Sequence, residues 1–283
     1  MTRPAEPAFQ PTDATALADL LAGASRAVFF TGAGVSTESG VPDYRSPHGL
    51  WAKYDPTTLT FDRYVASADV RRLTWQLRQE FFAAGAKPNP AHRAIAAFED
   101  AGRSLGVITQ NIDGLHTEAG SRTVVEIHGT ARTVGCIGSA PRYSAPEGCG
   151  WSADTAWAFD RIDAGDDDPH CPVCSGLVKS ATISFGQAMD ESVLRRATGL
   201  LDRADAVIVV GSSLQVHPAA GLPAQAAARG IPCAIVNREP TPLDDQVTVV
   251  VHGSAGEILP PAVAAALAGD GTGTGPGRGT ARS

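Results

Sequence analysis

The sequence predicts an α/β protein in which a doubly wound, Rossmann-like parallel sheet of about six strands carries a smaller lobe. Three observations support this prediction. Short apolar runs alternate with amphipathic helical patterns along most of the chain, as in a parallel sheet covered on both faces. The first apolar run ends in a glycine-rich loop. Residues 47–87 and 131–180 interrupt the alternation and are assigned to the smaller lobe, which is part helical and part cysteine-containing.

Each element follows from the spacing of its apolar residues. The strands are short runs of mainly β-branched, aromatic and small apolar residues, predicted at residues 27–30, 105–109, 123–127, 206–210, 233–236 and 247–251. The helices repeat apolar residues every three or four positions, and they are predicted at residues 14–22, 91–101, 190–203, 219–229 and 256–267.

These elements divide the chain into two lobes. The Rossmann-like domain is predicted at residues 13–46, 88–130 and 181–268. The small lobe combines a helical, charged insertion at residues 47–87 with the cysteine segment at residues 131–180, and the cleft between the lobes is the expected site. The two ends of the chain, residues 1–12 and 269–283, are predicted to be a disordered lead and tail.

Composition limits the classes of function. A chain of 283 residues with 43% hydrophobic residues is able to bury a full core. Its formal net charge of −7 argues against a nucleic-acid binder that works through a basic face. No apolar run reaches membrane-spanning length and no signal sequence is recognisable, so we expect a cytoplasmic protein. Five cysteines, an odd number, fit a reducing compartment in which some bind metal.

The loop at residues 31–45, TGAGVSTESGVPDYR, is predicted to hold a nucleotide. Gly32 and Gly34 permit a tight turn and close backbone approach, while Ser36 and Thr37 supply hydroxyl donors. Thr37 stands where the G-x-G-x-x-G fingerprint requires its third glycine, so an ordinary small-residue turn is an alternative for this part alone.

The second half of this loop, GVPDYR, favours a functional site. Pro42 stiffens the chain, and Asp43, Tyr44 and Arg45 then place a carboxylate, a ring and a guanidinium in one short loop. An ordinary connection has little use for such a cluster.

Small or polar residues follow the predicted strands. In open parallel sheets, ligands bind beyond the carboxyl ends of the strands, so these residues are candidates for the site. They are Gln110, Asn111, Asp113, His116, His128, Gly211, Ser212, Ser213 and Asn237.

Taken in order, GAGVS, GVPDYR, TQNIDGLH, the histidine of EIHG, GSSLQV and a paired-cysteine segment resemble a sirtuin, over roughly residues 15–265. The resemblance implies a bacterial NAD-dependent protein-lysine deacylase, most simply a deacetylase, and the PDYR loop is most similar to the class II branch. In the reaction it implies, the acyl oxygen attacks the nicotinamide ribose, nicotinamide leaves, and a ribose hydroxyl attacks the acyl carbon. The implied partners are acylated lysine side chains of proteins, with no nucleic acid and no membrane.

The resemblance also assigns roles at the NAD site. His128 is implied as the general base, which suits a side chain whose ordinary pKa is about 6.5. Asn111 and Asp113 are implied as its catalytic partners, Asp113 holding the nicotinamide carboxamide unless it only caps the next segment. The implied contacts to NAD are Gly32, Ala33, Gly34, Ser36, Thr37, Val41, Asp43, Tyr44, Arg45, Gln110, Asn111, Ile112, Asp113, Gly211, Ser212, Ser213 and Asn237.

On the acyl-lysine side, the resemblance implies that two segments clasp the substrate peptide as an added strand. The implied contacts are Ile183, Phe185, Gly186 and Val216. Phe185 is implied to form a wall of the lysine tunnel, with an ordinary core aromatic as the alternative.

The sequence departs from the sirtuin pattern at two places. The family's structural zinc site uses two C-x-x-C pairs, but Ser139 replaces the second cysteine of the first pair. A hydroxyl is a poor zinc ligand, so the site is lost, weakened or rescued by another residue. We predict that Cys149 rescues it, because the flanking Gly148 and Gly150 let the backbone turn its thiolate inward, giving a zinc site of Cys136, Cys149, Cys171 and Cys174. The Y-x-x-R pair of desuccinylase-type sirtuins is replaced by Trp75 and Arg78, and Arg78 is predicted to be an exposed helix residue rather than a ligand for an acidic acyl group.

Two other functions remain open from the sequence. A mono-ADP-ribosyltransferase would use the same NAD pocket, and a non-catalytic NAD-sensing module would need no base. The presence of Asn111, Asp113 and His128 together argues against the second alternative.

Overall fold

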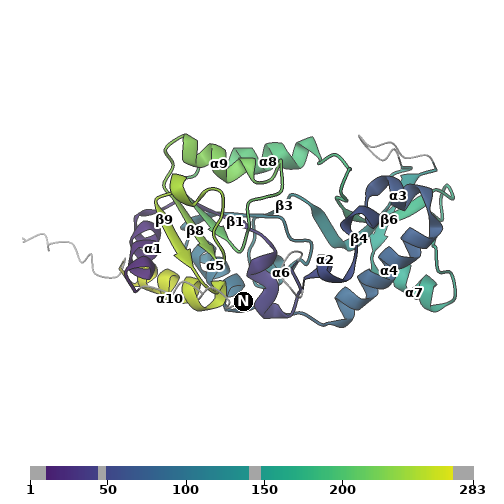
Figure 1. Ribbon diagram of the computed structural model, residues 1–283, viewed down its shortest axis with the longest axis horizontal. Coiled ribbons are helices and arrows are strands. Elements are labelled where there is room, and N and C mark those ends of the chain that lie inside the picture. Colours follow the sequence, from purple (N-terminus) through teal and green to yellow (C-terminus); the bar gives the residue numbers. More distant parts are fainter. Residues whose placement is uncertain (1–10, 44–48, 140–147, 270–283) are drawn as a thin grey trace, which may run out of the picture.

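The computed structural model describes residues 11–43, 49–139 and 148–269. The larger lobe is built around a parallel sheet of six strands in the order β3-β2-β1-β7-β8-β9, so the predicted fold class is confirmed (Figure 1). The strands are β1 (Ala27–Thr31), β2 (Ser104–Thr109), β3 (Val124–Glu126), β7 (Ala206–Val210), β8 (Cys233–Asn237) and β9 (Val249–His252). The chain order reverses between β1 and β7, which is where doubly wound sheets bind ligands.

Helices cover both faces of this sheet, because successive side chains of each strand point to opposite sides. Phe29 packs in a core with α1 (Pro11–Gly23), α5 (Pro90–Asp100) and α10 (Ala255–Ala268). Its neighbours Val28 and Phe30 pack in a second core with α8 (Glu191–Leu201) and α9 (Gly221–Ala228), which lie along the upper side of the sheet in Figure 1. Burial on both faces explains why the strands are continuous apolar runs.

Capping residues set the helix ends, so the observed bounds differ slightly from those predicted. Asp190 precedes α8 instead of starting it, since its carboxylate accepts hydrogen bonds from the amides of Ser192 at 2.7 Å and Val193 at 3.3 Å. Helix α1 already begins at Pro11, inside the predicted lead. Residues 1–10 and 270–283, which hold the rest of the lead and nearly all of the tail, lie outside the described residues.

Within the described ranges, no helix combines the length and apolarity needed to cross a membrane.

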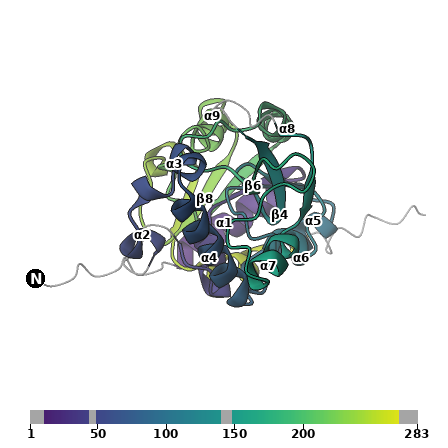
Figure 2. The same ribbon diagram turned by 90° about the vertical axis from the view of Figure 1, so that its right-hand side faces the viewer.

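The smaller lobe contains an antiparallel sheet that the sequence analysis missed (Figure 2). Its order is β5-β4-β6, with β4 (Gly129–Gly138), β5 (Ser152–Asp154) and β6 (Leu177–Thr182). Glycines and register shifts interrupt the pairing of β4 with β6, which hides the two-residue period in the sequence. The helical elements of the lobe are α2 (Leu50–Lys53), η2 (Pro56–Thr58), α3 (Phe61–Ala66), α4 (Ala68–Ala83) and α7 (Ala156–Asp163).

The helical insertion and the cysteine segment pack against each other. Trp75 of α4 is buried in one cluster with Cys136, Cys171 and Val178. Arg71, also in α4, forms a two-pronged ion pair with Asp168, with Nε–Oδ1 at 2.8 Å and Nη2–Oδ2 at 2.7 Å. Both side chains of this pair are largely buried, so the pair joins the two parts of the lobe in a well-defined geometry.

Candidate functional site

The glycine-rich loop after β1 packs directly on the end of β7. The amide of Gly32 donates to the carbonyl of Val210 at 3.1 Å, and the amide of Gly34 donates to that of Gly211 at 2.8 Å. A Cβ placed on Gly34 would lie 2.8 Å from the Cα atom of Gly211, and Gly211 itself has a φ of +63°. Only glycines allow this approach, and it brings Gly32–Gly34 beside the residues that follow β7.

Directly after Gly32 the chain forms the 3-10 helix η1 (Ala33–Ser39), which contains Gly34 and ends at Gly40 with a φ of +84°. An α-helix follows the first strand in an ordinary dinucleotide fold, and the third fingerprint glycine serves its packing on the sheet. Thr37 instead donates its hydroxyl to the Gly34 carbonyl at 3.0 Å. The short helix thus accounts for the missing glycine.

Three buried polar side chains meet below this loop. The Ser36 hydroxyl donates to Asp113 Oδ2 at 2.8 Å and accepts a hydrogen bond from Asn111 Nδ2 at 3.0 Å. The other carboxylate oxygen of Asp113 accepts from the Leu115 amide at 2.9 Å. Ser36 is fully buried, and its hydroxyl fixes the side chains of Asn111 and Asp113 relative to each other.

Two histidines complete this network: His116, which the strand-end rule had selected, and His92, which the sequence analysis missed. The Ser36 hydroxyl lies 3.3 Å from His92 Nε2, and the His92 and His116 ring centroids are 4.8 Å apart. His116 Nε2 lies 2.9 Å from the hydroxyl of Thr31 at the end of β1. The Asn89-Pro90 helix start was a usable signal, because Asn89 caps α5 and thereby directs His92 inward.

Because of these two histidines, we expect the folded state to lose stability in acid. Burial lowers the pKa of His92 to about 4, although Asp113 acts in the opposite direction, and burial also lowers the pKa of His116. Between pH 6.5 and 4 the unfolded chain then binds more protons than the folded one, so stability falls as pH falls. For His92 we expect a loss on the order of 2–3 kcal/mol in the free energy of unfolding.

Urea unfolding between pH 7.5 and 4.5 tests this prediction. His92→Gln should flatten the dependence, because the amide stays neutral throughout. His170→Gln, the same substitution at a half-exposed histidine outside this network, is the control for the substitution itself. Equal slopes in the wild type and His92→Gln would contradict the assignment.

His128 lies between the two lobes, after β3 and directly before β4. Its Nδ1 is 3.0 Å from the carbonyl oxygen of Gln110. A carbonyl only accepts hydrogen bonds, so Nδ1 carries the proton and Nε2 is the basic nitrogen. Burial lowers the pKa of His128, while the hydrogen bond to Gln110 has the opposite, smaller effect. The imidazole is therefore neutral at physiological pH, as a general base must be.

Further hydrogen bonds fix the His128 segment against the segment that carries Asn111 and Asp113. The Ala131 amide donates to the Ile112 carbonyl at 2.9 Å, and Arg132 Nε donates to the Asp113 carbonyl at 3.1 Å. The His128 carbonyl accepts from the Ile183 amide at 2.8 Å. His128, the amide-rich segment and the predicted substrate segment are thus joined at one edge of the sheet.

The remaining predicted NAD contacts are distributed along this edge. Gln110 donates its amide to the Ser212 hydroxyl at 2.7 Å, which links the ends of β2 and β7. Asn237 ends β8 and donates its amide to the Glu239 carbonyl at 2.7 Å. Tyr44 and Arg45 lie outside the described residues.

The predicted substrate residues differ in their surroundings. Phe185 is 46% exposed, so the alternative of a core aromatic is wrong for this residue. Its carbonyl accepts a hydrogen bond from the Phe61 amide at 2.9 Å, which places α3 beside the segment.

Arg78 is partly buried, with its guanidinium carbon 5.7 Å from the ring centroid of Phe81, so the prediction of an exposed arginine is wrong.

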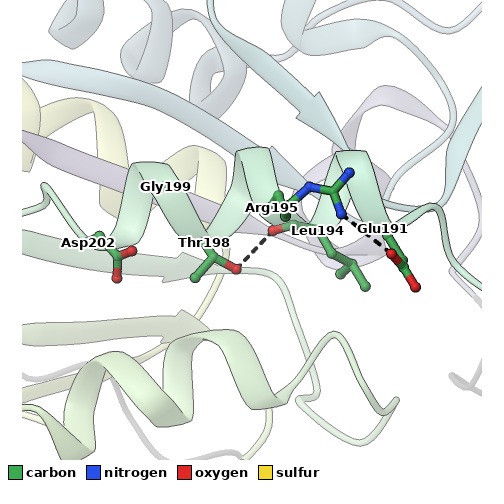
Figure 3. A pocket seen from close by; sticks show the side chains of 6 residues that line it. All are labelled: Glu191, Leu194, Arg195, Thr198, Gly199 and Asp202. Atoms are coloured by element: carbon green, nitrogen blue, oxygen red, sulfur yellow. Dashed lines mark hydrogen bonds and ion pairs between the residues drawn. The ribbon is translucent and has the colours of Figure 1, made fainter.

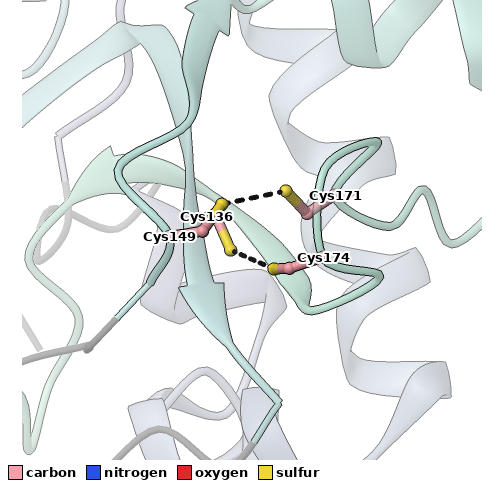
Figure 4. A group of neighbouring side chains, drawn as sticks. All are labelled: Cys136, Cys149, Cys171 and Cys174. Carbon is pink, nitrogen blue, oxygen red and sulfur yellow. Dashed lines mark hydrogen bonds between the residues drawn. The ribbon is translucent and has the colours of Figure 1, made fainter.

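The four predicted cysteines come together in the small lobe (Figure 4). Their sulfur atoms all lie within 4.8 Å of one another, with Cys136–Cys174 at 3.4 Å and Cys149–Cys171 at 3.5 Å. Four thiolates at about 2.3 Å from a tetrahedral zinc are separated by about 3.8 Å, so the cluster fits a closed structural zinc site. Ser139 is exposed at the end of β4.

A shallow depression on the outer side of α8 contains none of the predicted site residues (Figure 3). Its side chains all come from this helix and its C-terminal cap, and they include the ion pair of Arg195 with Glu191 at 3.4 Å. Such a solvent-facing pair gives the depression no chemistry beyond that of a charged helix surface.

Comparison with known proteins agrees with this geometry. The model of the Sir2 family matches residues 32–218. The NAD-dependent protein deacetylase 2 of Streptomyces coelicolor is 43% identical over 235 residues, which cover 81% of this chain and 93% of the relative. A solved structure described as "Structural Basis for the Mechanism and Regulation of Sir2 Enzymes" superposes with a TM-score of 0.80 at 37% identity, covering 92% of this chain and 99% of the other. A Sir2–p53 peptide–NAD+ structure has a TM-score of 0.75 at 34% identity and covers 85% and 93%, respectively.

Proposed function

This chain belongs to the Sir2 family and is an NAD-dependent protein deacetylase, and we propose that His128 is the general base of its reaction. The observation that carries the proposal is the hydrogen bond of His128 Nδ1 to the Gln110 carbonyl, which leaves Nε2 basic. This nitrogen is held at the strand edge where the glycine loop and the amide-rich segment meet. A base fixed there by the backbone needs no further reorganisation before proton transfer.

Asp113 and Asn111 are proposed to act on the cofactor side. When bound, NAD supplies a ribose carbon that accepts the acyl oxygen and a nicotinamide that leaves. Asp113 would hold the nicotinamide carboxamide, with Ala33, Val41 and Ile112 around it. Each Asp113 oxygen already accepts one protein hydrogen bond, and a carboxylate has about four acceptor sites, so capacity for a ligand remains.

The loop at the end of β7 is proposed to hold the phosphates. The close packing of Gly34 on Gly211 supports this, because it leaves no side chain between the two loops. Asn237, at the end of the next strand, would hold the adenosine ribose. Ser213, which is partly exposed beside the buried Ser212, would provide a hydroxyl donor.

Zinc fits the four-cysteine cluster, and we propose that Cys149 is the fourth ligand in place of the missing C-x-x-C cysteine. A site of four cysteine thiolates has no open coordination position, so its contribution would be structural. It would join β4, the segment around Cys149 and the turn between Cys171 and Cys174.

For the substrate, we propose an acetylated lysine in an extended peptide that pairs with the segment at residues 183–186. A homologous Sir2 protein was solved with a p53 peptide and NAD+, which supports this substrate class. The exposed Phe185 would line the path of the lysine stem. Arg78 stacks near Phe81 inside the small lobe, which favours acetyl over acidic acyl groups. Assignment to the class II branch remains a proposal based on the PDYR loop.

Nicotinamide release from NAD with an acetyl-lysine peptide tests the proposed function. We expect release that depends on the acetyl group and is matched mole for mole by deacetylated peptide. NAD labelled in its adenosine part should give a labelled small molecule. Label retained on protein would instead indicate ADP-ribosyl transfer, and no release with acetyl-, succinyl- and long-acyl-lysine peptides would contradict the proposal.

A further inference from the structure

Lys179 of β6 is a buried cation that the proposed reaction does not use. It is only 3% exposed. Its ammonium donates to the carbonyl oxygens of Thr182 and, at 3.3 Å, Ser180, and it lies 3.5 Å from the Thr182 hydroxyl. The three acceptors match the three donors of an ammonium, so the group binds the end of its own strand.

The surroundings of Lys179 give it no charge partner. Among the described residues, no carboxylate forms an ion pair with it, and the charged group that acts on it is Arg78 of α4, which has the same sign. Tyr64 of α3 donates its hydroxyl to the carbonyl of the preceding Val178 at 2.6 Å. Burial lowers the pKa of Lys179 to about 7. The amino group is therefore held by its hydrogen bonds to the strand end and not by an opposite charge.

The strand end that Lys179 holds is adjacent to His128. Thr182 pairs with Gly129, the residue after His128, and the next amide, that of Ile183, donates to the His128 carbonyl. The contact is tight, since a Cβ on Gly129 would lie 2.0 Å from the Ala181 carbonyl oxygen. A shift of this strand end would therefore move the His128 backbone.

The same strand end leads into the proposed peptide-binding segment. Residues 183–186 follow Thr182 directly, and Phe185 is fixed on one side by the Phe61 amide. The hydrogen bonds of Lys179 thus hold a strand end that contacts the His128 backbone and continues into the proposed peptide-binding segment.

We propose that Lys179 is a positioning residue for deacylation, whose ammonium holds Thr182 so that His128 and residues 183–186 keep their relative placement. The inference rests on the proposed roles of His128 and of this segment. It concerns the acyl-peptide side of the site, because Lys179 binds Ser180 and Thr182, directly before residues 183–186.

Lys179→Met, which keeps the length of the stem and removes the donors, tests this role. We expect kcat/KM for an acetyl-lysine peptide to fall about ten- to a hundredfold, with a higher KM for the peptide and a KM for NAD within about twofold of wild type. Lys179→Arg should recover part of the loss, since it restores buried donors. If Lys179→Met does not fold, Lys179→Gln replaces it; its shorter side chain has two donors instead of three, so we expect a smaller loss with the same split between the two KM values.

Arg71→Met is the matched control, because it removes another buried cation of the same lobe, one whose partners are Asp168 and the carbonyls of Tyr64 and Val65 instead of the strand end at Thr182. It should lower the melting temperature while leaving both KM values unchanged. Unchanged peptide kinetics in folded Lys179→Met, or the same kinetic change in Arg71→Met, would overturn the inference. Turnover by the wild type and its loss in His128→Ala, measured in the same assay, separate this outcome from failure of the proposed function.

Discussion

Replacing His128 with alanine is expected to lower deacetylation about 10²–10⁴-fold, the usual contribution of a positioned general base. The hydrogen bond to the Gln110 carbonyl fixes the proton on Nδ1, and burial lowers the pKa of the ring. Wild-type activity should therefore fall in acid only when pH drops below the ordinary histidine value of about 6.5, because protonation of Nε2 removes the base. In His128→Ala this acid limb should disappear from the small residual activity.

The measurement is kcat/KM for an acetyl-lysine peptide between pH 5 and 8.5. The melting-temperature shift produced by NAD should stay close to that of the wild type, since His128 is not expected to bind the cofactor tightly. His170→Gln alters a histidine outside the cleft and should retain turnover within about twofold. A His128→Ala protein that keeps more than about a tenth of wild-type activity would show that another group acts as the base.

The parallel sheet was predictable because its inner strands are buried on both faces. Each of the six appears in the sequence as an apolar run, and AVIVV gives β7 without any knowledge of its neighbours. The sheet of the small lobe lacked such a signal. Gly135 and Gly138 lie within β4, and its pairing with β6 shifts register twice, so the alternation of apolar and polar residues is broken.

Local sequence patterns likewise identified the site residues that follow strands, but not the residue that only the assembled fold brings to the site. His128 and Asn111 follow strands, and the rule that ligands bind at strand ends is sufficient to select them. His92 lies in the first turn of a helix, and its contact with Ser36 joins residues 56 positions apart. Only the assembled fold shows that α5 directs this ring toward η1, so a local pattern could not reveal it.

Cys149 provides the second large expected effect. Its flanking glycines suggested the role from sequence, and its sulfur lies 3.5 Å from that of Cys171, within a cluster of four. Cys149→Ser replaces a thiolate with a neutral hydroxyl, which is a poor zinc ligand. Because about 10–16 kcal/mol of zinc binding is shared by four ligands, we expect zinc affinity to fall by roughly a hundredfold or more.

Zinc per chain, measured after dialysis against a weak chelator, should be near one in the wild type and near zero in Cys149→Ser. Cys233→Ser is the matched control: this cysteine lies in β8, its thiol faces the Ile231 carbonyl at 3.1 Å, and the variant should keep its zinc. Cys136 and Val178 pair directly between β4 and β6, and β6 continues into Thr182 beside His128. Loss of zinc should therefore weaken peptide turnover more than NAD binding, which depends on the other lobe. Full zinc content in Cys149→Ser would exclude Cys149 as a ligand.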